Sequence, residues 1–216
     1  MKKRSLHGFA LLCAGLLASP FVAHASKVGE PAPAFTLTDS DGKTRSLEEF
    51  KGKTVVLEWT NADCPFVKKH YGSGNLQQQQ RNAIAQNIVW LSVNSTAKGR
   101  EGNVSGADAN KIRKEQKAAQ IAYLIDEDGK VGHAYGAKTT PHLFVIDGLG
   151  VLRYNGAIDN VPSTKVEDLA RATQYVPAVL ASLKKGEAIK PSSTQPYGCA
   201  VKYPLVNAEK EEDCGC

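Results

Sequence analysis

The sequence predicts an α/β fold, with a mixed central sheet and helices on both faces. Between residues 54 and 136, short apolar runs typical of buried strands alternate with longer, charged segments of helical composition. A hairpin pattern at residues 142–155 and a helical pattern at residues 163–184 follow. Strands that alternate with helices in this way are typical of a sheet that is covered on both sides.

The fold is expected to begin with a strand extension. Val28–Asp39 is rich in proline and then alternates between apolar and polar residues, as an edge strand does, and a turn follows at residues 41–42. Ser46 is placed to cap a short helical turn at Leu47–Phe50.

The rest of the fold is expected to contain two buried strands, helices, a small strand–helix insert and a hairpin. In chain order these are the strand Thr54–Trp59, a helix from Cys64 that is interrupted at residues 72–74, the helix Asn75–Gln86, the strand Ile88–Asn94, the helix Ala107–Gln120, the insert Ala122–Gly136, the hairpin strands His142–Asp147 and Val151–Asn155, and the long helix Ser163–Lys184.

Both ends of the chain are predicted to lie outside this fold. A basic start at residues 2–4 precedes an apolar run, and residues 23–25 have the small-x-small form (Ala-His-Ala) that signal peptidase cleaves. We expect residues 1–25 to be a secretory signal, residues 26–185 the folded domain and residues 186–216 a flexible tail that contains cysteines. An uncleaved anchor is the alternative, but the apolar run is shorter than the roughly 20 residues that a membrane span needs.

The charge and hydropathy of the chain bear on whether it binds nucleic acid or spans a membrane. Without residues 1–25 the chain keeps 24 basic and 22 acidic residues, a net charge of about +2, which gives no reason to expect nucleic acid. No other segment is apolar enough to span a membrane, and no cofactor is expected. The signal predicts a periplasmic or secreted protein, in a compartment that permits disulfides between the remaining cysteines.

Chemistry is expected at Cys64, in the stretch WTNADCPFVKKHY. A buried strand precedes it, and the following helix has proline at its first position. Free backbone N–H groups and the helix dipole at this end favour a thiolate over a thiol. The alternative is a buried structural cysteine. Lys68 and Lys69 lie about one turn further on. They could add positive potential at Cys64, but we interpret them as ordinary solvated lysines.

Two other positions are candidates for the same site. Glu58 lies in an apolar strand; if it points inward, burial raises its pKa and lets it exchange protons, and otherwise it is a solvated carboxylate. Thr140 and Pro141 open a strand, where an X–Pro bond can be cis. Such a kink would hold the Thr140 backbone near the thiol, bind an extended peptide and keep metal ions away. The alternative is a trans proline at an edge strand.

Three segments together resemble the thioredoxin-like superfamily, and within it the redoxin and peroxiredoxin-like branch of the alkyl hydroperoxide reductase/thiol-specific antioxidant type. They are VGEPAPAFTLTDSDGK, VVLEWTNADCPFVKKHY and IDEDGKVGHAYGAKTTPHLFVIDGLGVLRYNGAIDN. The resemblance covers about Lys27 to Lys184 and implies the three-layer thioredoxin-like fold. It gives Cys64 the place of the nucleophilic cysteine, Pro141 that of the cis-proline and Glu58 that of the buried acid.

The resemblance also implies an activity. The chain is expected to be an exported thiol-dependent oxidoreductase that reduces protein disulfides or hydroperoxides and is restored by an external thiol. Two departures bear on this expectation. Val67 stands where thioredoxins carry their second cysteine, and Leu57 and Asn61 stand where peroxiredoxins carry the proline and threonine of Pro-x-x-x-Thr-x-x-Cys. A local CxxC cycle is therefore excluded, and a peroxide pocket cannot be assumed.

A second thiol must then come from the tail or from another molecule. Cys199, within YGCAVKY, is the first choice as the resolving thiol, because about 14 residues after the last helix can reach across a domain. The alternative for Cys199 is a structural bridge or a pairing elsewhere. Cys214 and Cys216 are the other candidates, as electron relays or as ligands of a soft metal, and the alternative for them, which we favour, is a frayed end without function. The rival function is a non-catalytic copper carrier, although no spacing in the chain predicts a built metal site.

Overall fold

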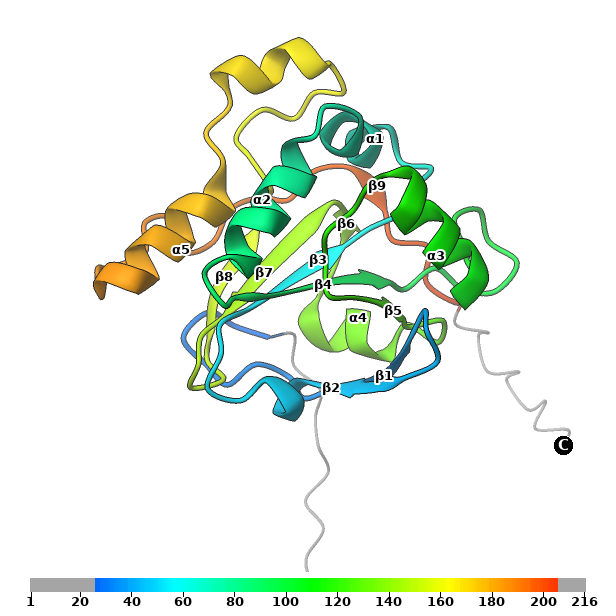
Figure 1. Ribbon diagram of the computed structural model, residues 1–216, viewed down its shortest axis with the longest axis horizontal. Coiled ribbons are helices and arrows are strands. Elements are labelled where there is room, and N and C mark those ends of the chain that lie inside the picture. The colour runs from blue at the N-terminus through cyan, green and yellow to red at the C-terminus, as the bar shows by residue number, and fades with distance from the viewer. Residues whose placement is uncertain (1–25, 206–216) are drawn as a thin grey trace, which may run out of the picture.

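The computed structural model describes residues 26–205 and has three layers, with helices on both sides of a twisted sheet (Figure 1). The sheet has seven strands in the order β2-β1-β5-β4-β3-β7-β8, and a separate pair joins β6 to β9. The strands are β1 (Thr36–Asp39), β2 (Thr44–Ser46), β3 (Val55–Trp59), β4 (Val89–Asn94), β5 (Ala122–Ile125), β6 (Thr139–Thr140), β7 (His142–Ile146), β8 (Leu152–Gly156) and β9 (Cys199–Ala200). The helices are η1 (Leu47–Phe50), α1 (Pro65–Gly72), α2 (Asn75–Ile84), α3 (Gly106–Glu115), α4 (Lys130–Tyr135), η2 (Val166–Arg171) and α5 (Tyr175–Lys185).

Strand β3 is the centre of the sheet. It pairs in parallel with β4 and antiparallel with β7, and each of its five residues is buried. Because successive side chains point to opposite faces, Leu57 and Trp59 enter the core that lies against α4, while Val56 enters the core under α1, α2 and α5. The predicted mixed sheet with helices on both faces is confirmed.

The predicted helix Ser163–Lys184 is wrong. The structure has the short 3-10 helix η2 and the helix α5, separated by extended residues. Pro177 accounts for the break, because in one continuous helix its ring would collide with the carbonyl of Thr173. Pro177 instead lies in the first turn of α5, where a missing N–H is harmless. The backbone N–H of Thr173 is bonded to Asn160 Oδ1 at 2.7 Å.

Two predicted elements are shorter in the structure. The strand expected at Val28–Asp39 is reduced to β1, which starts at Thr36. The helix expected at Ala107–Gln120 ends at Glu115. Lys117 adopts a left-handed backbone with φ of 50°, which turns the chain away from the helix axis.

The tail that we expect to be flexible from residue 186 packs against the domain in residues 192–203, here called the C-terminal arm. Figure 1 shows it crossing the molecule to β9, which lies beside β6. Backbone bonds tie the arm to the domain on both sides of β9, from Asn155 N to Ser192 O at 3.3 Å and from Val201 N to Lys138 O at 3.0 Å. Its aromatic side chains are partly buried, so the arm fills space that a solvated tail would leave open.

The other predictions for the chain ends concern residues that the structure does not describe. The expected signal at residues 1–25, and Cys214 and Cys216, lie outside the described residues. Within residues 26–205, no helix combines the length and the apolar character that a lipid bilayer requires of a spanning segment.

The sheet core gives a first prediction. Leu124 on β5 is fully buried in the core against α4, whereas Leu149 in the β7–β8 turn is 85% exposed. We expect Leu124→Ala to lower the free energy of unfolding by about 2–5 kcal/mol, through lost burial and the cavity left behind. The same truncation at Leu149 should change it by less than about 0.5 kcal/mol. Urea unfolding followed by circular dichroism measures both, and equal losses would contradict the assigned core.

Candidate active site at Cys64

Cys64 lies where β3 gives way to α1. Its backbone is extended and it forms the N-cap of α1, with Pro65 in the first turn. The loop before it is closed by a bond from Cys64 N to Asn61 O at 3.1 Å, and the helix starts with Lys68 N bonded to Cys64 O at 2.9 Å. The side chain is only 1% exposed and packs with the core under α1 and α5. The local sequence therefore places the sulfur at a helix N-terminus.

Strand β6 brings Thr140 and Pro141 against this sulfur. The peptide bond between these two residues is cis, as the sequence predicts. Cys64 Sγ donates a hydrogen bond to the carbonyl oxygen of Thr140 at 3.0 Å. Cys64 and the Thr140–Pro141 pair thus lie together although 76 positions separate Cys64 from Thr140 in the sequence.

The C-terminal arm adds a second thiol to the same place. Strand β9 pairs antiparallel with β6, and the register sets Cys199 opposite Thr140. Cys199 packs against the core cluster that contains Cys64, and both cysteines are free. Gly198 makes this approach possible, because a Cβ at this position would lie 2.0 Å from Thr140 O, and its φ of 136° is unfavourable for other residues.

The two thiols differ in their electrostatics. Burial is the largest influence on Cys64 and raises its pKa, but the side chains of Cys199 and Thr140 and the backbone N–H of Val67 outweigh it, and the net pKa is lowered. Burial, together with the neighbouring side chain of Cys64 and its charge, raises the pKa of Cys199 to about 12. Cys64 is therefore the more acidic of the two thiols.

Glu58 points inward, onto the same face of the sheet as α1 and α2, and is fully buried. Its carboxylate accepts hydrogen bonds from Trp90 Nε1 (2.8 Å), Tyr71 Oη (2.9 Å), Gln80 Nε2 (3.3 Å) and Ser92 Oγ (3.4 Å). Burial raises the pKa of Glu58 to about 7, and the four hydrogen bonds, led by that of Trp90, oppose the shift. These contacts do not include Cys64, so a role of Glu58 in proton transfer to that sulfur stays a prediction.

The interpretation of Lys69 as a solvated lysine is wrong, whereas Lys68 is exposed. Lys69 and His70 are both buried and lie near the carboxylate of Asp159. One sequence signal points to His70: it follows Val67 by three residues, and such pairs share one side of a helix. Nothing in the sequence singles out Asp159, because it lies in the loop after β8 and its contacts come from α1 and the C-terminal arm.

Metal ligands are sparse in the part of the chain that the structure describes. No group of three or more histidine, cysteine, aspartate or glutamate side chains is placed there to hold a metal ion. The rival copper carrier would have only the thiols of Cys64 and Cys199 together in this region. Its other proposed ligands, Cys214 and Cys216, lie outside the described residues.

The sequence model of the AhpC/TSA family matches residues 28–155, more than half of the chain and including both Cys64 and Pro141. The chain belongs to the AhpC/TSA family. The match ends before Cys199, so the C-terminal arm lies beyond the part that defines this AhpC/TSA-family domain.

Relatives of this AhpC/TSA-family chain are named as peroxiredoxins and thiol–disulfide exchange proteins. Peroxiredoxin Q of Oryza sativa subsp. japonica is 25% identical over 143 residues, which cover 58% of this chain and 66% of that protein. Thiol:disulfide interchange protein DsbE of Pasteurella multocida is 30% identical over 142 residues, covering 65% of this chain and 71% of that protein. The chain thus spans slightly less than two thirds of the peroxiredoxin Q that it matches.

Solved structures agree on the fold. An uncharacterized conserved protein from Geobacillus kaustophilus has a TM-score of 0.71 at 24% identity, over 83% of this chain and 93% of its own. A hypothetical protein from Sinorhizobium meliloti 1021 has a TM-score of 0.70 at 22% identity, over 84% and 97%. With the family match, the expected thioredoxin-like fold of redoxin type is confirmed.

Glu58 gives a prediction on pH dependence. Its pKa is about 7 in the folded protein against 4.5 for a free glutamate, so the folded state retains a proton that the unfolded state releases. The free energy of unfolding should therefore fall as pH rises through this window. Between pH 5 and 8, we expect the wild type to lose roughly 2–3 kcal/mol relative to Glu58→Gln.

Urea unfolding at both pH values measures this difference. Glu127→Gln is the matched control, because Glu127 is exposed and its substitution should change stability by less than about 0.5 kcal/mol at either pH. A constant difference between Glu58→Gln and the wild type would show that the carboxylate does not titrate in this range.

Cys199 gives a prediction on the ionisation of Cys64. Since the thiol of Cys199 lowers the pKa of Cys64, Cys199→Ala should move that pKa upward. Cys199→Ser keeps a donor and should give an intermediate pKa. The pKa of Cys64 is measured in the wild type and in both variants from its rate of alkylation by iodoacetamide over a pH series, with the labelled peptides separated by mass spectrometry. If the three alkylation midpoints coincide, the interaction between the two thiols has no electrostatic effect.

Proposed function

We propose that the chain is an exported thiol-dependent oxidoreductase in which Cys64 is the nucleophile and Cys199 the resolving thiol. The observation that carries the proposal is the pairing of β6 with β9, which sets Cys199 beside Cys64 with the pKa values of the two thiols moved in opposite directions. A low-pKa sulfur next to a protonated one is the arrangement that nucleophilic attack followed by resolution needs.

With a hydroperoxide, the Cys64 thiolate attacks the distal oxygen and the O–O bond breaks. The alcohol leaves with a proton, and Cys64 is oxidised to the sulfenic acid. Cys199 then attacks the sulfur of Cys64, and the S–O bond breaks with the release of water. The product is a disulfide between Cys64 and Cys199.

With a disulfide substrate, the Cys64 thiolate attacks one sulfur and displaces the other as a thiolate. Cys199, after losing its proton, attacks the Cys64 sulfur of the mixed disulfide and releases the remaining half of the substrate. The same Cys64–Cys199 disulfide results. Both routes end at one oxidised state, and an external thiol reductant must restore it through exchange.

The other site residues have supporting roles in the proposal. The backbone of Thr140, held by the cis bond to Pro141, accepts the hydrogen bond of the reduced Cys64 thiol and pairs with β9. Glu58, with a pKa of about 7, is suited to store or return a proton at neutral pH. The arm takes over the task of the missing second cysteine, because Val67 cannot resolve an oxidised Cys64.

The test is disulfide mapping by mass spectrometry after treatment with one equivalent of hydrogen peroxide or of an oxidised dithiol. We expect a Cys64–Cys199 peptide with at least one of these oxidants, and none in Cys64→Ser. The Cys214→Ser/Cys216→Ser double variant separates the candidates for resolution. If it still forms the bridge, Cys199 resolves directly.

Two other results would reject the cycle. A persistent sulfenic acid on Cys64 in the wild type would move resolution to an external thiol. Unchanged turnover of both oxidants in Cys64→Ser would show that Cys64 is not the nucleophile.

A further inference from the structure

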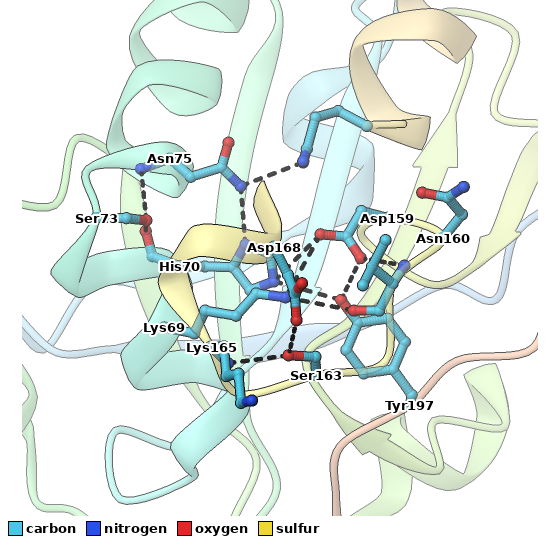
Figure 2. A network of polar contacts seen from close by, with 12 residues as sticks. Lys69, His70, Ser73, Asn75, Asp159, Asn160, Ser163, Lys165, Asp168 and Tyr197 are labelled. Carbon is cyan, nitrogen blue, oxygen red and sulfur yellow. Dashed lines mark hydrogen bonds and ion pairs between the residues drawn. The ribbon is translucent and has the colours of Figure 1, made fainter. Parts of the chain in front are cut away.

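The arm is anchored next to Cys199 by a buried polar group that the proposed cycle does not use. Tyr197, two residues before Cys199, meets Lys69, His70 and Asp159; these four residues are here called the Asp159 cluster. Figure 2 shows their side chains converging between α1 and the loop that follows β8. Lys69, His70 and the Asp159 carboxylate have no exposed side-chain surface.

The hydroxyl of Tyr197 makes the central contact of this cluster. It donates to Asp159 Oδ1 and lies 3.5 Å from His70 Nε2. The ring is also held: Phe66 packs edge-on at 5.6 Å between centroids, and Lys69 Nζ lies 5.8 Å from its centre. Tyr197 is therefore fixed at its polar tip and on its apolar body.

The hydroxyl of Tyr197 is one of two hydrogen-bond donors to the buried carboxylate of Asp159 among the described residues. Its Oδ1 also accepts a bond from Val161 N at 2.9 Å, but its Oδ2 has no hydrogen-bond partner among residues 26–205. Lys69 Nζ and His70 Nε2 each lie 3.8 Å from Oδ2, too far for a good hydrogen bond. Burial lowers the pKa of His70 to about 4, so at neutral pH Lys69 is the cation that balances the carboxylate.

The chain between Tyr197 and Cys199 has little stiffness of its own. Gly198 separates them, and glycine gives the backbone wide freedom when the arm is not docked. Two residues of extended chain span only about 7 Å. An anchor at Tyr197 therefore limits how far the sulfur of Cys199 can move from Cys64. The pairing of β9 with β6 comprises just two residues on each strand.

We propose that Tyr197 is a positioning residue for the resolving step: its hydrogen bond to the buried Asp159 holds the arm so that Cys199 stays within reach of Cys64. The proposal rests on the proposed function. In the step concerned, the S–S bond between Cys199 and Cys64 forms while water or a substrate thiolate leaves Cys64. Tyr197 touches neither sulfur, and it acts by raising the effective concentration of one thiol at the other.

The experiment is a redox titration of the Cys64–Cys199 disulfide against glutathione, in the wild type and in Tyr197→Phe. Phenylalanine keeps the ring contacts and removes only the hydroxyl. A hydrogen bond to a charged group of this kind predicts a ~10-fold lower effective concentration of Cys199 at Cys64. The disulfide of the variant should then be ~30 mV more oxidising than that of the wild type.

Tyr135→Phe is the matched control. Tyr135 is buried, and its hydroxyl donates to Pro33 O at 2.7 Å, in the opposite core of the sheet. Loss of that hydroxyl should leave the potential unchanged. A shift below about twofold in Tyr197→Phe overturns the proposal, and so does an equal shift in Tyr135→Phe, because the effect would then be a general loss of stability.

The wild type separates the two proposals. If it forms no Cys64–Cys199 disulfide at any glutathione ratio, the proposed function fails before Tyr197 is tested. If it forms the disulfide and Tyr197→Phe has the same potential, only the positioning role fails. Thermal unfolding of each reduced variant shows whether it is folded during the titration.

Discussion

The main-chain atoms of Thr140 are the place where three distant segments of the molecule meet. The helix α1 brings the Cys64 thiol to its carbonyl, β6 continues through the cis bond into the sheet at β7, and β9 pairs with it from the end of the chain. The site depends on this meeting point because Cys64 has no neighbouring cysteine. Thr140 pairs with β9 and not with a strand of the seven-stranded sheet. If its backbone were paired within that sheet, it could not hold Cys64 and Cys199 at one place.

Three ionisable groups are buried around this point: Glu58, Cys64 and Asp159. The free-energy cost of burying each one is offset by a different set of contacts. Glu58 keeps four neutral donors and still has a pKa of about 7. Cys64 is stabilised as a thiolate by donors from the arm and the helix backbone. Asp159 has a lysine at 3.8 Å and a tyrosine hydroxyl. Breaking a buried pair of the last kind costs about 3–5 kcal/mol, so the Asp159 cluster constrains the structure even where it takes no part in chemistry.

Much of this arrangement could be read from the sequence, because local rules determine it. Apolar runs marked the strands, and the proline after Cys64 marked the start of a helix. The failures have a common cause in long-range contacts. The arm was expected to be flexible since its composition is that of a linker, but its aromatic residues and Gly198 fit a surface built by distant strands. The sequence near Lys69 predicts a solvated lysine. It gives no sign of the buried partner, Asp159, because that residue lies 90 positions further along the chain.

The order of the segments has a consequence for biogenesis. Every element around Cys64 except the arm comes from residues before 186, and Cys199 follows Cys64 by 135 residues. During synthesis the helix and its sulfur are therefore complete before the covering strand exists. In that interval the thiol of Cys64 is not covered by β9, and thiols of other molecules can reach it until the last segment docks.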